Sequence, residues 1–184
     1  MSIYSWYENA ATQTSANATD SVPVYPGGVG PPKILTIPNL LTGSAGVVDT
    51  TATTLTITQA LHGNRIMTVS SAAPIAVTLP QATGTGTVYK FQMQVAATAT
   101  SSTIKVANST DVMQGVSWCL TTASANVVGY GTSASSDTIS LNGTTTGGVI
   151  GDIIEITDVK TGFFSVKMFS SPTGTTSTPF SATV

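Results

Sequence analysis

VYKFQMQV, residues 88–95, is the stretch that decides how this chain folds. Its side chains alternate in character: Tyr89, Phe91, Met93 and Val95 occupy one parity, and Val88, Lys90, Gln92 and Gln94 the other. Successive side chains of a β-strand point to opposite faces, so one set enters a core while the other meets solvent or a partner. The stretch therefore predicts a half-buried β-strand.

The same alternation recurs on both sides of this stretch. Apolar residues at every second position predict further strands around Leu55–Ile57, Ile75–Leu79, Ile104–Val106, Ile139–Leu141 and Phe164–Met168. Turn signals separate these runs, at residues 62–64, 84–86, 142–143 and 161–162. Several short strands at regular spacing are typical of an all-β domain, either a β-sandwich, which includes jelly rolls, or a barrel. The strand order cannot be derived from this pattern.

The composition narrows the classes of function. Charged residues make up 8% of the chain, against about 25% in typical soluble proteins. Thr, Ser, Ala and Gly take their place, and the formal net charge is -2. The basic footprint of a nucleic-acid-binding protein is therefore missing. No apolar run approaches the roughly 18 residues of a membrane-spanning helix, so neither nucleic acid nor membrane is expected as a partner.

Residues 1–50 differ from the rest and predict an extended arm or linker before a domain at 51–184. Prolines and glycines crowd residues 23–32, where proline removes backbone donors and glycine removes side-chain contacts. The beginning of the arm is nevertheless rich in large apolar side chains, namely Ile3, Tyr4, Trp6 and Tyr7. We expect these four residues to dock on a partner surface or on a neighbouring subunit. Residues 1–15 lack the features of a secretory signal, so synthesis in a reducing cytoplasm is expected.

The run at residues 149–159 has a denser apolar pattern than the other strands. Its isoleucines Ile150, Ile153, Ile154 and Ile156 occupy both parities. This pattern predicts a strand that is buried on both faces, and these residues are candidates for an oligomer interface.

Few residues could support catalysis or bind a metal. His62 is the only histidine and Cys119 the only cysteine, which argues against a His/Cys metal site and a Ser-His-Asp triad. Cys119 follows Trp118 in an apolar stretch, so we interpret it as a buried structural thiol. Of the two tryptophans, Trp6 is interpreted as an anchor and Trp118 as a core residue. No enzymatic activity and no cofactor are expected.

The densest acidic group consists of Asp152, Glu155 and Asp158. In a strand, Asp152 and Asp158 share a face while Glu155 points the other way, which argues against the paired carboxylates of a glycosidase. A weak calcium site at a strand end is one interpretation. Solvated carboxylates at the strand ends are the interpretation we prefer.

Three segments resemble a known family: HGNRIMTVSSAAPIAVTLPQATGTGTVYKFQMQV, STIKVANSTDVMQGV and SSDTISLNGTTTGGVIGDIIEITDVKTGFFSVKMF. In the order of their motifs they are similar to capsid decoration (cement) proteins of tailed phages. The resemblance covers about residues 55–181 and leaves out the first fifty.

The resemblance implies a viral structural protein that associates, often as a homotrimer, on the outer surface of the virion. There it would bridge and stabilise subunits of the major capsid protein of the same phage, after assembly in the host cytoplasm. Similar modules also occur in fibres, so the alternative is a phage fibre or receptor-binding module that contacts a host glycan.

Overall fold

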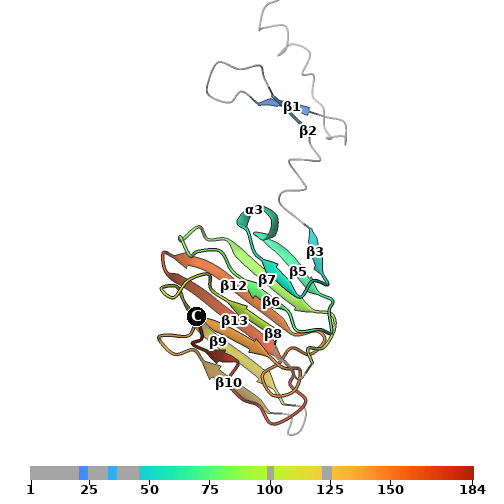
Figure 1. Cartoon of the computed structure of the whole chain (residues 1–184), viewed down its shortest axis with the longest axis vertical. Coiled ribbons are helices and arrows are strands. Elements are labelled where there is room, and N and C mark those ends of the chain that lie inside the picture. Colours follow the sequence, from blue (N-terminus) through green and yellow to red (C-terminus); the bar gives the residue numbers. More distant parts are fainter. Residues whose placement is uncertain (1–20, 25–32, 37–45, 99–101, 122–125) are drawn as a thin grey trace, which may run out of the picture. The chain divides into compact units, whose positions relative to one another are not determined.

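The computed structural model of the chain describes residues 21–24, 33–36, 46–98, 102–121 and 126–184. The anchor residues predicted at the start of the arm lie outside these ranges. The chain divides into two compact units, Met1–Ala45 and Gly46–Val184. In the first unit, β1 (Ser21–Val24) and β2 (Lys33–Thr36) form an antiparallel pair (Figure 1).

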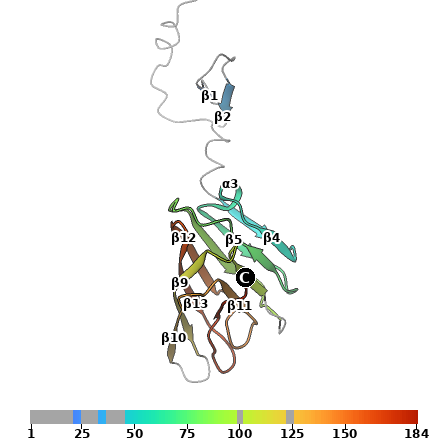
Figure 2. The ribbon, with the colours of Figure 1, turned by 60° about the vertical axis from the view of Figure 1, so that its left-hand side comes forward.

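The described residues of the second unit form two mixed β-sheets and one short helix, α3 (Gln59–His62) (Figures 1 and 2). The larger sheet has seven strands, in the order β10 (Val127–Gly131), β9 (Val112–Leu120), β13 (Phe163–Ser170), β12 (Ile153–Lys160), β7 (Val88–Met93), β5 (Arg65–Val69) and β3 (Val47–Thr50). The smaller has five, in the order β14 (Phe180–Ser181), β11 (Thr138–Leu141), β8 (Ser102–Lys105), β6 (Ala76–Thr78) and β4 (Thr54–Thr56).

The hydrophobic core draws on one face of each sheet, which makes this unit a β-sandwich. The seven-stranded sheet contributes, among others, Phe91, Ile154 and Val166, and the five-stranded sheet contributes residues such as Val77 and Ile104. On the apolar parity of the six alternating runs, every residue is buried except Leu55 and Val95, which are half-buried. The prediction of an all-β domain is therefore confirmed, and of its two alternatives, sandwich or barrel, the structure has the sandwich. The alternation of buried and exposed side chains in the strands is the reason that the fold class was predictable.

Sheet pairing adds what the pattern could not predict. Antiparallel pairs such as β12–β13 and β12–β7 lie beside parallel ones, among them β9–β13 and β5–β7. The edge strand β3 pairs in parallel with β5. The compact unit consequently begins at Gly46 rather than at Thr51, where the composition changes.

The run at residues 149–159 is not buried on both faces within this chain. Strand β12 begins at Ile153, and its burial alternates. Ile154 and Ile156 are fully buried in the core of the sandwich, so they cannot form an interface between subunits. Ile150 and Ile153 are exposed, and for these two residues the interface remains a prediction. Isoleucines at both parities therefore do not require burial on both faces. They also occur when the outer face of a strand carries exposed apolar residues, as Ile153 does here.

One glycine of the large sheet is required by close packing between strands. Gly115 of β9 pairs with Val166 of the parallel strand β13, and a Cβ at this position would overlap the carbonyl oxygen of Val166. Gly129 of the neighbouring strand β10 has open space where its Cβ would be. The two glycines therefore form a matched pair for testing this contact.

We expect the substitution Gly115→Ala to lower the free energy of unfolding by roughly 3 kcal/mol, because the added methyl group forces strands β9 and β13 apart. The control Gly129→Ala should change it by less than about 0.5 kcal/mol. Urea denaturation of both variants measures the difference. Equal stabilities would show that the two strands are not packed as described.

Candidate functional site: an apolar stripe on the large sheet

The outer face of the seven-stranded sheet carries a row of exposed apolar side chains, which we call the apolar stripe. It consists of Val127, Leu120, Trp118, Phe169 and Ile153, whose exposed fractions are 64%, 51%, 39%, 55% and 45%. Strand register places them side by side, because Val127 pairs with Leu120, Trp118 with Phe169, and Phe169 with Ile153. The stripe thus crosses β10, β9, β13 and β12, and Ile150 lies just before β12.

The two aromatic rings at the centre of the stripe stack on each other. The ring centroids of Trp118 and Phe169 are 5.1 Å apart, with an interplanar angle of 17°. On the other side of Trp118 the register partner is Gly129, which leaves open space above β10. An open groove of about 470 Å³ adjoins the stripe and is lined by Trp118, Leu120, Val127 and Phe169 together with Gly151, Asp152, Ser170 and Ser171.

The polar side chains that line the groove have hydrogen-bond partners within the chain. The hydroxyl of Ser170 lies 3.2 Å from the sulfur of Cys119, and Ser171 donates to the carboxylate of Asp152. That carboxylate also accepts hydrogen bonds from backbone N–H groups. The groove therefore offers a ligand mainly apolar contact.

The prediction that Trp118 is a core residue was wrong, because its side chain is 39% exposed. Adjacent residues of a strand face opposite sides, so Trp118 and Cys119 cannot both point inward. Cys119 is fully buried, as predicted, and Trp118 is therefore on the outer face. Phe169 has the same parity as Lys167, which the alternation had already placed outside. Strict alternation along the two strands would therefore have predicted that Trp118 and Phe169 are both on the outer face.

A short charged row lies beside the stripe on the same face. Glu155 of β12 lies between Lys90 of β7 and Lys167 of β13, with N–O distances of 3.5 Å to both lysines. Glu155 is two residues from Ile153, and Lys167 is two residues from Phe169. Because a strand rises about 3.3 Å per residue, the charged row runs about 7 Å from the stripe.

Asp158 is buried, so the interpretation of a solvated strand end was wrong. Its carboxylate accepts hydrogen bonds from the N–H groups of Thr83, Gly84 and Thr85, at 3.1, 2.7 and 3.1 Å. Burial by itself raises the pKa of Asp158, but the N–H donors and the Thr85 hydroxyl outweigh it and hold this pKa below its ordinary value. Asp158 therefore fastens the loop before β7 as a charged group.

Asp152 is buried in the same way at the other end of β12. It accepts N–H groups of Gly148, Val149 and Ser171 at 2.8 to 3.0 Å. Here burial prevails over these hydrogen bonds and raises the pKa of Asp152. Asp152 and Asp158 share a face, as the strand parity predicted, but this face is the inner one, while Glu155 points outward. Their lone pairs are used by the chain itself, and this leaves the calcium interpretation without support.

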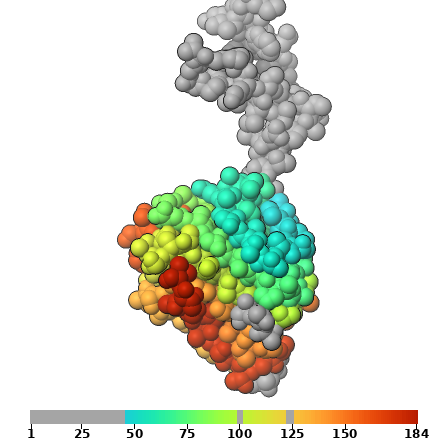
Figure 3. All heavy atoms as spheres, in the orientation of Figure 1, coloured from blue at the N-terminus to red at the C-terminus, as the bar shows by residue number. Residues whose placement is uncertain are grey.

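Two further carboxylates hold loops and the C-terminal end. Asp137 accepts hydrogen bonds from the Thr138 hydroxyl and from the N–H groups of Thr183 and Val184. The last residues of the chain lie on the surface (dark red in Figure 3). Burial raises the pKa of Asp137, but these bonds outweigh it and lower the pKa below its ordinary value. Asp111 accepts the N–H of Ala82 at 2.8 Å.

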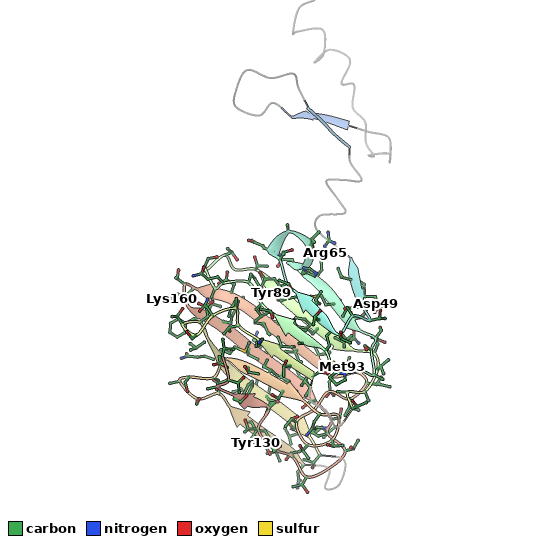
Figure 4. All side chains as sticks on the ribbon, viewed as in Figure 1. Asp49, Arg65, Tyr89, Met93, Tyr130 and Lys160 are labelled. Atoms are coloured by element: carbon green, nitrogen blue, oxygen red, sulfur yellow. The ribbon has the colours of Figure 1, made fainter. Side chains whose placement is uncertain are left out.

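The remaining candidates for chemistry have structural roles. His62 is buried, and its Nδ1 accepts the backbone N–H of Thr58 at 3.0 Å. Tyr130 of β10, labelled in Figure 4, donates its hydroxyl to Thr176. In the described ranges, no three His, Cys, Asp or Glu side chains are grouped as a metal site would require. Those ranges also contain no helix that is long and apolar enough to span a membrane.

Comparisons with known proteins found no matching family model, no matching curated protein and no matching solved structure. The likeness to decoration proteins thus remains an expectation from the motifs, and the apolar stripe is the strongest structural indication of function.

We expect Asp158→Asn to destabilise the fold by about 3 kcal/mol at pH 7, because an amide replaces a charged acceptor of several buried N–H groups. The folded-state pKa of Asp158 is lowered, so its stabilisation is present above the ordinary value of 3.8 and is lost as the pH falls through the folded pKa. The difference between wild type and variant should therefore shrink below that value.

Chemical denaturation between pH 2.5 and pH 7 measures this difference. The control is Glu155→Gln, since the exposed pairs of Glu155 with two lysines contribute at most about 1 kcal/mol. A difference between wild type and Asp158→Asn that stays constant with pH would contradict a charged Asp158 in the folded state.

Proposed function

We propose that this chain is a non-enzymatic structural protein that binds another protein surface through its apolar stripe. We further propose that it is a decoration protein on the outer capsid surface of a phage, with the major capsid protein as its partner. The observation that carries the binding role is the row of five exposed apolar side chains on one sheet face. Contiguous exposed apolar patches mark interaction sites more often than isolated residues do.

The buried carboxylates support a role without catalysis. Asp152 and Asp158 point inward and bind backbone N–H groups, and Glu155 lies between two lysines. A general acid or base needs access to a substrate, and the exposed fractions of these two aspartates are only 2% and 3%. The described residues thus provide surfaces for binding and stable loops.

Binding linkage is the proposed mechanism of stabilisation. A protein that binds the assembled shell but not its dissociated subunits stabilises the shell by mass action. An oligomer would strengthen this effect, because several weak contacts act together on a repeating surface. A low content of charged residues suits such contacts, since few ions lose hydration on docking.

A fibre or receptor-binding module is the second candidate function. The exposed pair Trp118 and Phe169 favours it, because aromatic rings can pack on sugar rings. The side-chain hydroxyls and the carboxylate of the groove, however, are already paired within the chain. A glycan would find few side-chain partners for its own hydroxyl groups there, so the protein-binding role is preferred.

We expect Phe169→Ser to weaken binding to phage shells stripped of this protein by about tenfold or more, because an exposed aromatic anchor is lost. The control is Leu61→Ser, which removes a similarly exposed apolar side chain from α3. Co-sedimentation of the purified full chain with stripped shells measures the binding.

Both variants must first show wild-type thermal unfolding. Binding by wild type that neither substitution affects would exclude the stripe as the contact. If wild type fails to bind the shells but binds host glycans, the fibre or receptor role replaces the decoration role.

Self-association as a homotrimer is a separate proposal, supported by the family resemblance and by exposed Ile150, which lies outside the apolar stripe. Light scattering coupled to chromatography should report three times the chain mass of 18.7 kDa, either in solution or for protein released from virions. The variant Ile150→Ser should dissociate the trimer without unfolding the subunit. A monomer at every concentration and on the virion would contradict this proposal.

A further inference from the structure

The charges that a partner can reach differ from the formal net charge. The sandwich, residues 46–184, contains six acidic and five basic side chains. Four of the acidic ones are buried aspartates at positions 111, 137, 152 and 158. Only Asp49 and Glu155 remain at the surface, and Asp49, on edge strand β3 (Figure 4), accepts hydrogen bonds from Thr68 and Ser70. The charged side chains at the surface of the sandwich are therefore predominantly basic.

Two of the basic side chains lie next to the apolar stripe. Lys90 and Lys167 share one carboxylate, that of Glu155, so this row carries one positive charge in excess. The exposed fractions of the two lysine side chains are 47% and 60%. Both ammonium groups are thus accessible to a partner that covers the stripe. Lys105 lies on β8 of the other sheet, and Lys160 lies at the end of β12 that is remote from the stripe.

We infer that the stripe binds a protein segment that carries apolar side chains followed by carboxylates. The apolar part covers the stacked rings of Trp118 and Phe169, and the carboxylates pair with Lys90 and Lys167. This inference rests on the proposed role of the stripe as a partner-binding surface, and it defines the chemistry of that partner.

A second copy of the chain fits the stripe less well. Its own sandwich presents mainly basic groups, so two copies face to face would bring like charges together unless each Glu155 left its lysines. A segment with exposed carboxylates meets no such repulsion. The charge distribution therefore favours a different, acidic partner over self-association at this face.

Two peptides of matched apolar content test the inference. One consists of Leu-Phe-Leu followed by three aspartates, and the other of Leu-Phe-Leu followed by three lysines. Each is titrated into the full ¹⁵N-labelled chain at low salt, and the indole N–H signal of Trp118 is followed. Comparison with the variant Trp118→Phe distinguishes this signal from that of Trp6.

We expect the acidic peptide to bind about fivefold more tightly, since exposed ion pairs each contribute modestly. The preference should vanish in Lys90→Gln/Lys167→Gln and in about 1 M salt, where screening is strong. The matched control Lys105→Gln/Lys160→Gln should keep it. Phe169→Ser should weaken both peptides, and thermal unfolding verifies that every variant is folded.

Several results would overturn the inference: equal affinity for the two peptides, no shift of the Trp118 signal by either, or a preference that survives Lys90→Gln/Lys167→Gln. A Trp118 signal that depends on protein concentration without peptide would assign the stripe to a second copy and would also overturn it. An acidic preference without binding to stripped shells supports the inference and contradicts only the decoration role. Binding to stripped shells without a preference for the acidic peptide supports the decoration role and contradicts the inference.

Discussion

Buried aspartate carboxylates are the interaction on which the rest of this sandwich depends. A sheet satisfies the hydrogen bonds of its strands, but the loops between strands need other acceptors. Asp158 supplies one for the loop at residues 83–85, and Asp152 supplies one for residues 148–149 and 171. Asp137 does the same for the C-terminal residues. Each carboxylate thus joins its own position by hydrogen bonds to loop or terminal residues, several of which are far away in the sequence.

This use of carboxylates changes what the surface can do. Aspartates that bind backbone N–H groups cannot reach a partner or a substrate, so the few acidic residues of the sandwich are mostly withdrawn from its surface. Basic side chains and threonines remain outside. The chain is formally acidic, yet the groups beside the apolar stripe are mainly basic. A net charge computed from composition thus conceals the charge that a partner would contact.

The apolar stripe shows how a strand can be amphipathic in an unusual sense. In β12 and β13 the inner face is apolar, as in any sandwich, but the outer face is apolar at one end and charged further along. Ile153 and Phe169 lie at the apolar end, and Glu155 and Lys167 in the charged part. A single sheet face can therefore present an anchor and a charge pattern together, which is the basis for the proposed binding role.

The sequence alone determined the class of fold and most of the core. Alternation at residues 88–95, and in five similar runs, is a local property of a β-strand, so burial of side chains such as Phe91 and Val166 was predictable. The shared face of Asp152 and Asp158, the buried thiol of Cys119 and the turn glycines were local inferences of the same kind. The exposure of Trp118 was also within reach, because it follows from the burial of its neighbour.

Only the tertiary structure decided which strands are neighbours and what the polar residues contact. Parallel pairs such as β9–β13 join segments whose order in the sheet cannot be derived from a period of two. This pair and the antiparallel pairs β10–β9 and β12–β13 together create the stripe from four separate strands. The N–H donors of Asp158 come from a loop more than seventy residues away in the chain, so its burial could not be derived from its own surroundings. The local alternation of residues specifies to which face of the sheet a side chain points. The long-range pairing of strands decides which other residues that side chain contacts.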